Sequence, residues 1–164
     1  MRGNETVVSK DLSDGPLTGL KVLDMTVAVQ GPHVGAFLSD MGAEVIKVEP
    51  PGGELNRYAR GPGFDYGMEV MGSQQVAMNR GKKSIALDAH TDLGKRVLNE
   101  LIKKSDVFVT NYRAEALDRM SLSYDHMRRI NERLIYGRVS GFGTKGKDAE
   151  KAMLDGAAQA RGGL

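Results

Sequence analysis

The sequence predicts an α/β fold in which an open parallel sheet carries helices on both faces. Short β-branched apolar runs alternate along the chain with segments whose apolar residues recur at helical spacing. Glycine and proline stand between these segments, where they separate one element from the next. Because strand and helix alternate in this way, we expect the strands to be parallel and joined by right-handed crossovers.

The first elements form a β–α–β unit. They are a strand at 20–25 (LKVLDM), a helix at 33–41 and a strand at 43–49 (AEVIKVE). The apolar face of the helix is formed by Val34, Phe37, Leu38 and Met41. Gly42 follows the last of them and is placed to end the helix. The glycine-rich stretch 50–75 comes next, has little periodicity, and is predicted to be a long loop, functional or disordered.

The second half of the chain continues the alternation. Its predicted strands lie at 83–88 (KSIALD), 106–111 (DVFVTN) and 134–143 (LIYGRVSGFG). A helix capped by Thr91 carries apolar residues from Leu93 to Ile102 on one face. Two shorter helices are expected at 114–119 and 123–131, and Ser123 is placed to cap the second one.

Composition and charge exclude several classes of protein. The net charge of +2 is too small to favour nucleic acid or an anionic membrane surface as a partner. No apolar run exceeds three residues when glycine is set aside, whereas a membrane-spanning helix needs about 20. The polar residues 1–15 contain no secretory apolar segment and are expected to form a flexible arm. The absence of cysteine excludes thiol chemistry and favours the cytoplasm.

The carboxyl ends of the predicted strands mark the expected ligand edge. They lead into five loops, at residues 26–32, 49–53, 88–91, 111–113 and 141–145. Basic residues lie beside two of the strands, namely Arg80, Lys82, Lys83, Arg113 and Arg119. Two basic clusters at one sheet edge predict a polyanionic ligand such as a pyrophosphate or a phosphoadenosine. A solvated basic surface is the alternative.

Other ligand classes fit the residues less well. The loop after the first strand reads VAVQGPHVG, which lacks the G-x-G-x-x-G of dinucleotide sites, and Pro32 removes one N–H donor. Glu49, at the end of the second strand, is therefore interpreted as a solvated acid rather than a ribose ligand. The histidines, His33, His90 and His126, lack the spacing of a metal site, although His90 lies at a ligand-facing position. Neither a serine-hydrolase elbow nor a P-loop occurs.

Several sequence blocks are informative as a set. They are GLKVLDMT, LSDMGAEVIKVEPPGG, MNRGKKSIALD, DVFVTNYR, LDRMSLSYD, INERLIYGRVSGFG and DGAAQARGG. In this order they resemble the family III CoA-transferases, such as formyl-CoA and carnitine CoA-transferases, to which the α-methylacyl-CoA racemases are related. The resemblance covers residues 16–164. It implies the N-terminal part of a Rossmann-like large domain that binds CoA, and this large domain would be incomplete in the present chain.

The resemblance also implies where CoA is bound. The pair that faces the thioester in the transferases corresponds to Val29 and Gln30, with the glutamine displaced by one position. The implied contacts after the third and fourth strands are Leu87, Asp88, Ala89, His90, Asn111, Tyr112, Arg113, Arg119 and Met120. A last contact stretch is implied at 152–155, where Asp155 corresponds to an acidic residue near the CoA pocket. The alternative for Asp155 is a helix-start acid that accepts from the N–H groups of the next residues.

The activity implied by the resemblance is transfer of CoA between an acyl-CoA thioester and a carboxylic acid through an aspartyl anhydride. The nucleophilic aspartate is implied beyond Leu164, so we expect a truncated chain that is inactive by itself. Leu154 stands where the racemases have a catalytic histidine, which disfavours racemisation. A non-catalytic CoA- or nucleotide-binding or subunit-interaction module is the other alternative.

The implied partners are an acyl-CoA and a carboxylic acid. CoA enters as a substrate, and neither a tightly bound cofactor nor a metal is expected. Family members form interlocked homodimers, which implies the same assembly for the full-length protein. No nucleic-acid or membrane partner is expected.

Overall fold

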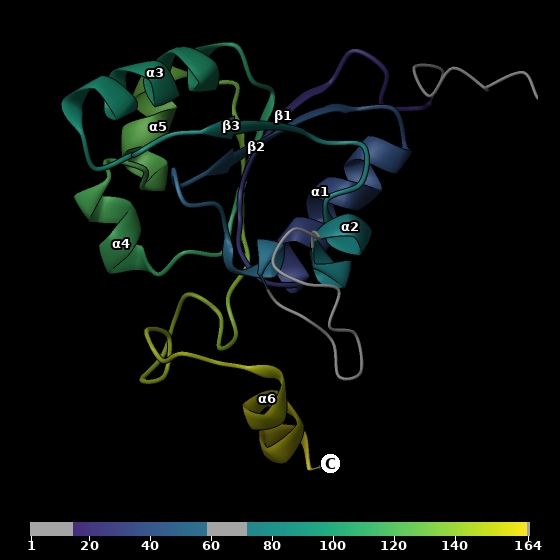
Figure 1. Cartoon of the computed structure of the whole chain (residues 1–164). Coiled ribbons are helices and arrows are strands. Elements are labelled where there is room, and N and C mark those ends of the chain that lie inside the picture. Colours follow the sequence, from purple (N-terminus) through teal and green to yellow (C-terminus); the bar gives the residue numbers. More distant parts are fainter. Residues whose placement is uncertain (1–14, 59–71, 164) are drawn as a thin grey trace, which may run out of the picture.

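The structure is a computed structural model that describes residues 15–58 and 72–163. These residues form a parallel sheet of five strands in the order β3-β2-β1-β4-β5 (Figure 1). The strands are β1 (Lys21–Met25), β2 (Glu44–Glu49), β3 (Lys83–Ala86), β4 (Val107–Thr110) and β5 (Ile135–Arg138). The predicted α/β class is confirmed, and the strand order is that of a Rossmann-like sheet.

Helices cover both faces of the sheet (Figure 1). One face carries α1 (Gln30–Asp40) and α2 (Ser73–Met78), and the other carries α3 (Asp92–Lys103), α4 (Ala114–Arg119) and α5 (Tyr124–Ile130). Each face has its own core, because successive side chains of a strand point to opposite sides. Leu23 and Phe108 belong to the larger core under α3, α4 and α5. Val22 and Val45 belong to the smaller core under α1.

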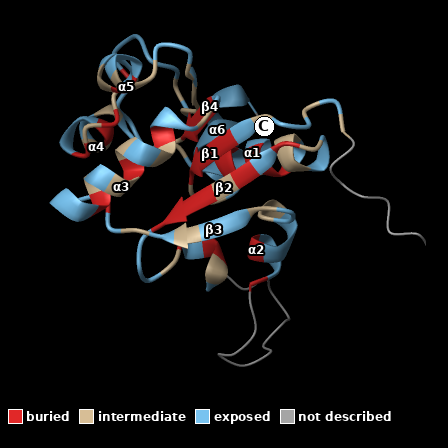
Figure 2. Cartoon of the chain, turned by 90° about the horizontal axis from the view of Figure 1, so that it is seen from above, coloured by how far each residue is buried: buried red, intermediate tan, exposed pale blue. Residues whose placement is uncertain are grey.

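Burial is greatest at the centre of the sheet and falls toward its edges. Figure 2 shows β1 and β4 mostly in the colour of buried residues, whereas β3 is largely exposed or intermediate. The last helix, α6 (Asp155–Gly162), lies apart from the sheet (Figure 1) and has no buried residue. It is joined to the preceding loop by Arg161, which pairs with Asp148 at 2.9 Å. The guanidinium of Arg161 also lies over the ring of Phe142.

Some boundaries differ from the predicted ones. Helix α1 begins at Gln30 rather than at 33, because Pro32 stands in its first turn, where no N–H has an intrahelical acceptor. The strands β3 and β5 end at Ala86 and Arg138, before the predicted 88 and 143. Pairing of β5 stops there because its neighbour β4 ends at Thr110 and the chain turns into α4.

The prediction of one long loop at 50–75 is wrong in its described parts. A 3₁₀ turn, η1 (Leu55–Arg57), lies near its start, and α2 begins at Ser73 near its end. Both elements are too short to show a helical period in the sequence. The middle of the stretch, residues 59–71, lies outside the described residues.

Two other expectations concern the ends and the division of the chain. The predicted arm at 1–15 lies outside the described residues except for Gly15. The assignment of 16–164 to one incomplete CoA-binding domain stays a prediction. Among residues 15–58 and 72–163, no helix is long and apolar enough to cross a bilayer.

The two predicted helix caps have different outcomes. Thr91 caps α3 as expected, since its Oγ1 accepts the N–H of Gly94 at 3.0 Å. Ser123 occupies the cap position of α5, but its side chain makes no capping hydrogen bond. Ser123 therefore occupies the predicted cap position but does not form the predicted hydrogen bond to the backbone.

Gly94 in α3 is expected to tolerate no side chain. A Cβ at this position would lie 1.8 Å from the carbonyl oxygen of Asp88. That oxygen also accepts the N–H and the hydroxyl of Thr91, so its movement would loosen the start of α3. We expect Gly94→Ala to lower the free energy of unfolding by about 2 kcal/mol, measured by urea denaturation. The control is Gly156→Ala in exposed α6, where nothing lies within 4 Å of the new Cβ. Equal losses in the two variants would contradict the prediction.

Candidate functional site

The two central strands place the candidate site. The chain leaves β1 toward α1 on one face of the sheet and leaves β4 toward α4 on the other. Neighbouring loops that diverge in this way form the crevice in which parallel α/β sheets bind ligands. The loops concerned are 26–29, before α1, and 111–113, before α4.

A cavity of about 420 Å³ opens beside the carboxyl end of β4. Its walls are formed by His90, Asn111, Tyr112, Arg113, Glu115, Ala116, Arg119 and Met120. All but two of these, Glu115 and Ala116, are predicted site residues. The structure therefore brings the segment after β3 and the segment after β4 together around one cavity, although β2 and β1 stand between these two strands in the sheet.

The rim of the cavity is basic. Arg113 and Arg119 are both exposed and supply two guanidinium groups. Arg119 faces Glu115 at 4.0 Å, but both side chains are more than half exposed, so water screens this pair strongly. Among the described residues, Arg113 takes part in no ion pair. A guanidinium that is not neutralised by a protein carboxylate is suited to bind a phosphate through two parallel hydrogen bonds, that is, as a bidentate donor.

The floor of the cavity is apolar. Met120 is only 4% exposed and belongs to the larger core, against which the half-buried Tyr112 also packs. Burial, together with the negative charges of Glu54 and Asp24, raises the pKa of the Tyr112 hydroxyl above its usual value. Tyr112 is therefore neutral at physiological pH. An apolar floor below a basic rim suits a ligand that joins an aromatic or aliphatic part to phosphates.

Val29 and Gln30 lie at the start of α1, where both are exposed, and they do not line the cavity. The link between them and the cavity is Asn111. Its Oδ1 accepts the N–H of Val27 at 2.9 Å, and its Nδ2 donates to the carbonyl oxygen of Val27 at 2.8 Å. The same residue therefore lines the cavity and fixes the turn that leads into α1.

The other predicted site residues lie outside the cavity wall. Ala89 is buried in the larger core and Leu87 packs against it, so neither presents a free side chain. The carboxylate of Asp88 accepts the N–H of His90 at 2.9 Å and so shapes the loop that carries His90. Asp155 is exposed at the start of α6 and accepts from Gln159 at 2.6 Å. Asp155 is the first residue of α6, so the helix-start position of the alternative is confirmed, whereas its described hydrogen bond goes to the side chain of Gln159 and not to a backbone N–H.

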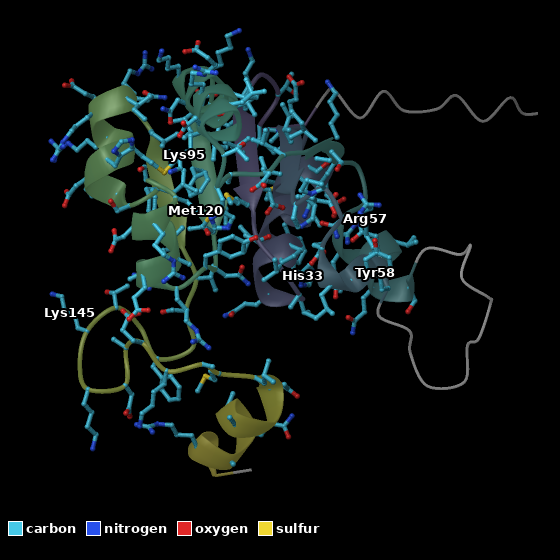
Figure 3. All side chains as sticks on the ribbon, turned by 60° about the vertical axis from the view of Figure 1, so that its left-hand side comes forward. His33, Arg57, Tyr58, Lys95, Met120 and Lys145 are labelled. Carbon is cyan, nitrogen blue, oxygen red and sulfur yellow. The ribbon has the colours of Figure 1, made fainter. Side chains whose placement is uncertain are left out.

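Three ion pairs on the α1 face, each with at least one buried side chain, were missed by the sequence prediction. Lys82 Nζ lies 2.7 Å from Asp24 Oδ2, and Lys47 Nζ lies 3.5 Å from Glu54 Oε1. All four of these side chains are at most 2% exposed. The third pair joins Glu49 to Arg57, whose Nε donates to Glu49 Oε2 at 2.6 Å. Figure 3 labels Arg57 beside α2 and Met120 on the side of α4, so this network and the cavity floor belong to different faces of the sheet.

The network corrects two predictions. Glu49 is 2% exposed and paired, so it is not a solvated acid. The basic residues before β3 do not join Arg113 and Arg119 at one ligand edge, because Arg80 pairs with Asp40 at the end of α1 and Lys83 with Glu44 at the start of β2. Lys82 is buried and forms an ion pair with Asp24, so its charge does not face the cavity beside β4.

A signal for this network is present in the sequence. Asp24 and Lys47 stand at strand positions of the same parity as the apolar Val22 and Val45, which face α1. A charged residue on the buried face of a central strand requires a partner of opposite charge. The residue types indicate that such partners exist, but the pairing itself is not readable from the sequence.

Comparisons with known proteins identify the family of this chain. The model of CoA-transferase family III matches residues 17–164. The chain is 36% identical over 153 residues to the acetyl-CoA:oxalate CoA-transferase of Acetobacter aceti, covering 92% of this chain and 38% of that relative. It is 39% identical over 149 residues to the human succinyl-CoA:glutarate CoA-transferase, covering 91% of this chain and 33% of the relative. The chain therefore spans less than two-fifths of the length of these relatives.

A solved structure gives the same result for the fold. The crystal structure of a CaiB/BaiF family protein from Brucella suis superposes with a TM-score of 0.85 at 39% identity. The match covers 92% of this chain and 40% of the Brucella chain. Since the family match extends over nearly all residues from Leu17 onward, the resemblance seen in the sequence blocks is confirmed. The chain belongs to CoA-transferase family III.

Proposed function

We propose that this chain forms the CoA-binding part of an acyl-CoA:carboxylate CoA-transferase. The observation that carries the proposal is the cavity beside β4, which combines two arginines with an apolar floor and includes six residues implied by the family resemblance. CoA has the matching chemistry, because its phosphates are joined to an adenine ring and to a long flexible arm. The relatives named above transfer CoA between thioesters and acids, which supports the reaction class.

The cavity residues have distinct roles in this proposal. Arg113 and Arg119 bind the phosphates of CoA, and His90 adds a hydrogen-bond donor from the segment after β3. Tyr112 and Met120 provide the apolar contact for the adenine or the pantetheine arm. The backbone of residues 87–89 completes the binding surface. Asp155 would support the site as an acid from α6.

The thioester end of CoA would lie at Val29 and Gln30. The first N–H groups of a helix have no acceptor within the helix, and the helix dipole is positive there. Such N–H groups stabilise the negative oxygen that develops when a carboxylate attacks a thioester carbonyl. The attack of an aspartate carboxylate breaks the C–S bond, releases CoA thiolate and leaves an acyl-aspartyl anhydride. That this aspartate lies beyond Leu164 stays an expectation.

The remaining expectations extend this proposal. We expect CoA to act as a substrate rather than a resident cofactor, and the full-length protein to work as a cytoplasmic homodimer. The names of the two relatives contain oxalate and glutarate, both short dicarboxylic acids. A short dicarboxylic acid is therefore the acceptor class that we propose.

Loss of either cavity arginine is expected to weaken CoA binding. We expect Arg113→Ala and Arg119→Ala each to raise the Kd for CoA about tenfold, because each removes one charge-assisted contact to a phosphate. Isothermal titration calorimetry of the 164-residue chain measures this. The matched control is Arg129→Ala, which removes an exposed arginine of α5 that does not line the cavity. A loss in the control equal to that at Arg113 would indicate unspecific charge attraction and would count against the proposed site.

A further inference from the structure

Side chains from several parts of the chain form hydrogen bonds with the backbone of the turn between β1 and α1. Lys47 of β2 donates from Nζ to the carbonyl oxygen of Thr26 at 2.9 Å. Asn111, after β4, binds both the N–H and the carbonyl of Val27. Lys47 is 1% exposed, so its contact is shielded from competing water.

The next residue of the turn, Ala28, has a backbone conformation that residues with a Cβ rarely adopt. Its φ of 63° lies in the left-handed region. The N–H of Ala28 donates to Glu54 Oε2 at 3.1 Å, and its carbonyl oxygen accepts from Asn56 Nδ2. Glu54 and Asn56 are 3% and 1% exposed. These two residues, called here the 54–56 clamp, therefore bind both backbone polar groups of Ala28, the residue with the unfavourable φ.

The clamp determines the direction in which α1 starts. Val29 and Gln30 follow Ala28 directly, so a change of φ at Ala28 would rotate the first turn of α1 away from its present place. The start of the helix is also packed without spare room, since a Cβ at Gly31 would lie 2.6 Å from the Cβ of Thr26. An unfavourable backbone conformation that is fixed by buried partners at a ligand edge is typical of a preorganised site.

We infer that Glu54 and Asn56 are positioning residues that hold Ala28 left-handed, so that the Val29–Gln30 end of α1 faces the thioester of a bound acyl-CoA. The inference rests on the proposed binding of CoA and goes beyond it, because neither clamp residue lines the cavity. It assigns the clamp to the acyl end of the ligand. The phosphate end is held by other residues, Arg113 and Arg119.

The experiment measures the contribution of the acyl end of the ligand and that of the phosphate end separately. Binding of acetyl-CoA and of adenosine 3′,5′-bisphosphate to the 164-residue chain is measured by calorimetry for the parent and for Asn56→Ala. We expect Asn56→Ala to weaken acetyl-CoA about tenfold and to leave the bisphosphate within about twofold, because only acetyl-CoA reaches the turn. Ala28→Gly in the Asn56→Ala background is expected to restore most of the affinity, since glycine adopts a positive φ without a clamp.

A matched control separates positioning from general stability. Asn131 is another amide with a structural role, because its Nδ2 donates to the carbonyl oxygens of Ile102 at 3.0 Å and of Ser105 at 2.8 Å, away from the turn. Asn131→Ala is expected to lower stability while leaving the affinity for acetyl-CoA unchanged. The inference is overturned by equal weakening of both ligands in Asn56→Ala, by no weakening, or by failure of Ala28→Gly to rescue.

Two further measurements cover the cases in which Asn56→Ala does not fold or the parent does not bind either ligand. If Asn56→Ala does not fold, Ala28→Val takes its place, because a β-branched residue disfavours the left-handed conformation while the clamp stays intact. If the parent binds neither ligand, the proposed function fails. Amide hydrogen exchange then decides whether the clamp holds the turn: protection at Ala28 is expected to fall about tenfold in Asn56→Ala, and unchanged protection overturns the clamp as well.

Discussion

Replacing Lys82 by methionine is expected to lower the free energy of unfolding by about 3–5 kcal/mol. The reason is that the carboxyl of Asp24 is fully buried and would lose its cationic partner. Lys82 Nζ also donates to the carbonyl oxygen of Pro32 and to Asn79 Oδ1, both at distances below 3 Å. The substitution would therefore leave three oxygen acceptors without their shared donor. It would also remove the hydrogen bonds through which Lys82 joins β1, α1 and the segment before β3.

The neighbouring residue provides the control for this prediction. Lys83 pairs with Glu44, but the two side chains are 72% and 42% exposed. Exposed pairs of this kind contribute about 0–1 kcal/mol, so Lys83→Met is expected to have little effect. The double variant Asp24→Asn/Lys82→Met removes both buried charges and is expected to recover part of the loss, because no unpaired carboxylate remains. Urea denaturation measures all three variants. A loss in Lys82→Met no larger than that in Lys83→Met would refute the importance of the buried pair.

Acid is expected to destabilise the protein chiefly through Glu49. Burial by itself would raise the pKa of this carboxyl, but hydrogen bonds from Arg57, Ser84 and the N–H of Glu54, together with the charge of Arg57, lower it from 4.5 to about 2. A carboxyl whose pKa is lower in the folded state stabilises the fold above its unfolded pKa. This stabilisation amounts to about 3 kcal/mol and is lost as the pH falls from about 4.5 toward 2.

The test is the pH dependence of the unfolding free energy. Glu49→Gln is expected to be less stable than the parent at pH 7 and to show a flatter pH dependence, so that the two curves converge in acid. Glu44→Gln is the control from the same strand. Its carboxyl has a pKa lowered by Lys83, but it is exposed, so most of the parent's pH dependence should remain. Parallel curves for the parent and Glu49→Gln would show that other groups govern acid unfolding.

The ligand edge of this protein is readable from the sequence to a large degree. His90 follows β3, and Asn111 to Arg113 follow β4, so their place at the carboxyl edge depends only on where two strands end. Strand ends are marked by local features, such as the apolar run 107–109 (VFV) and the capping residue Thr91. The cavity that unites these segments was therefore predictable in its main residues. Helix α2 was not, because six residues give no readable period.

The sequence by itself determined the α/β class, the parallel strands and the strand-end loops, because these follow from local periodicity and from residues that start or stop an element. Only the tertiary structure decided the sheet order and the buried charges. Lys82 meets Asp24 across 58 positions of the chain, and Asn56 meets Ala28 across 28. A charge or a left-handed alanine is stable at such a place only through the partner that packing brings to it. That partner is set by how the elements assemble, which no local pattern encodes.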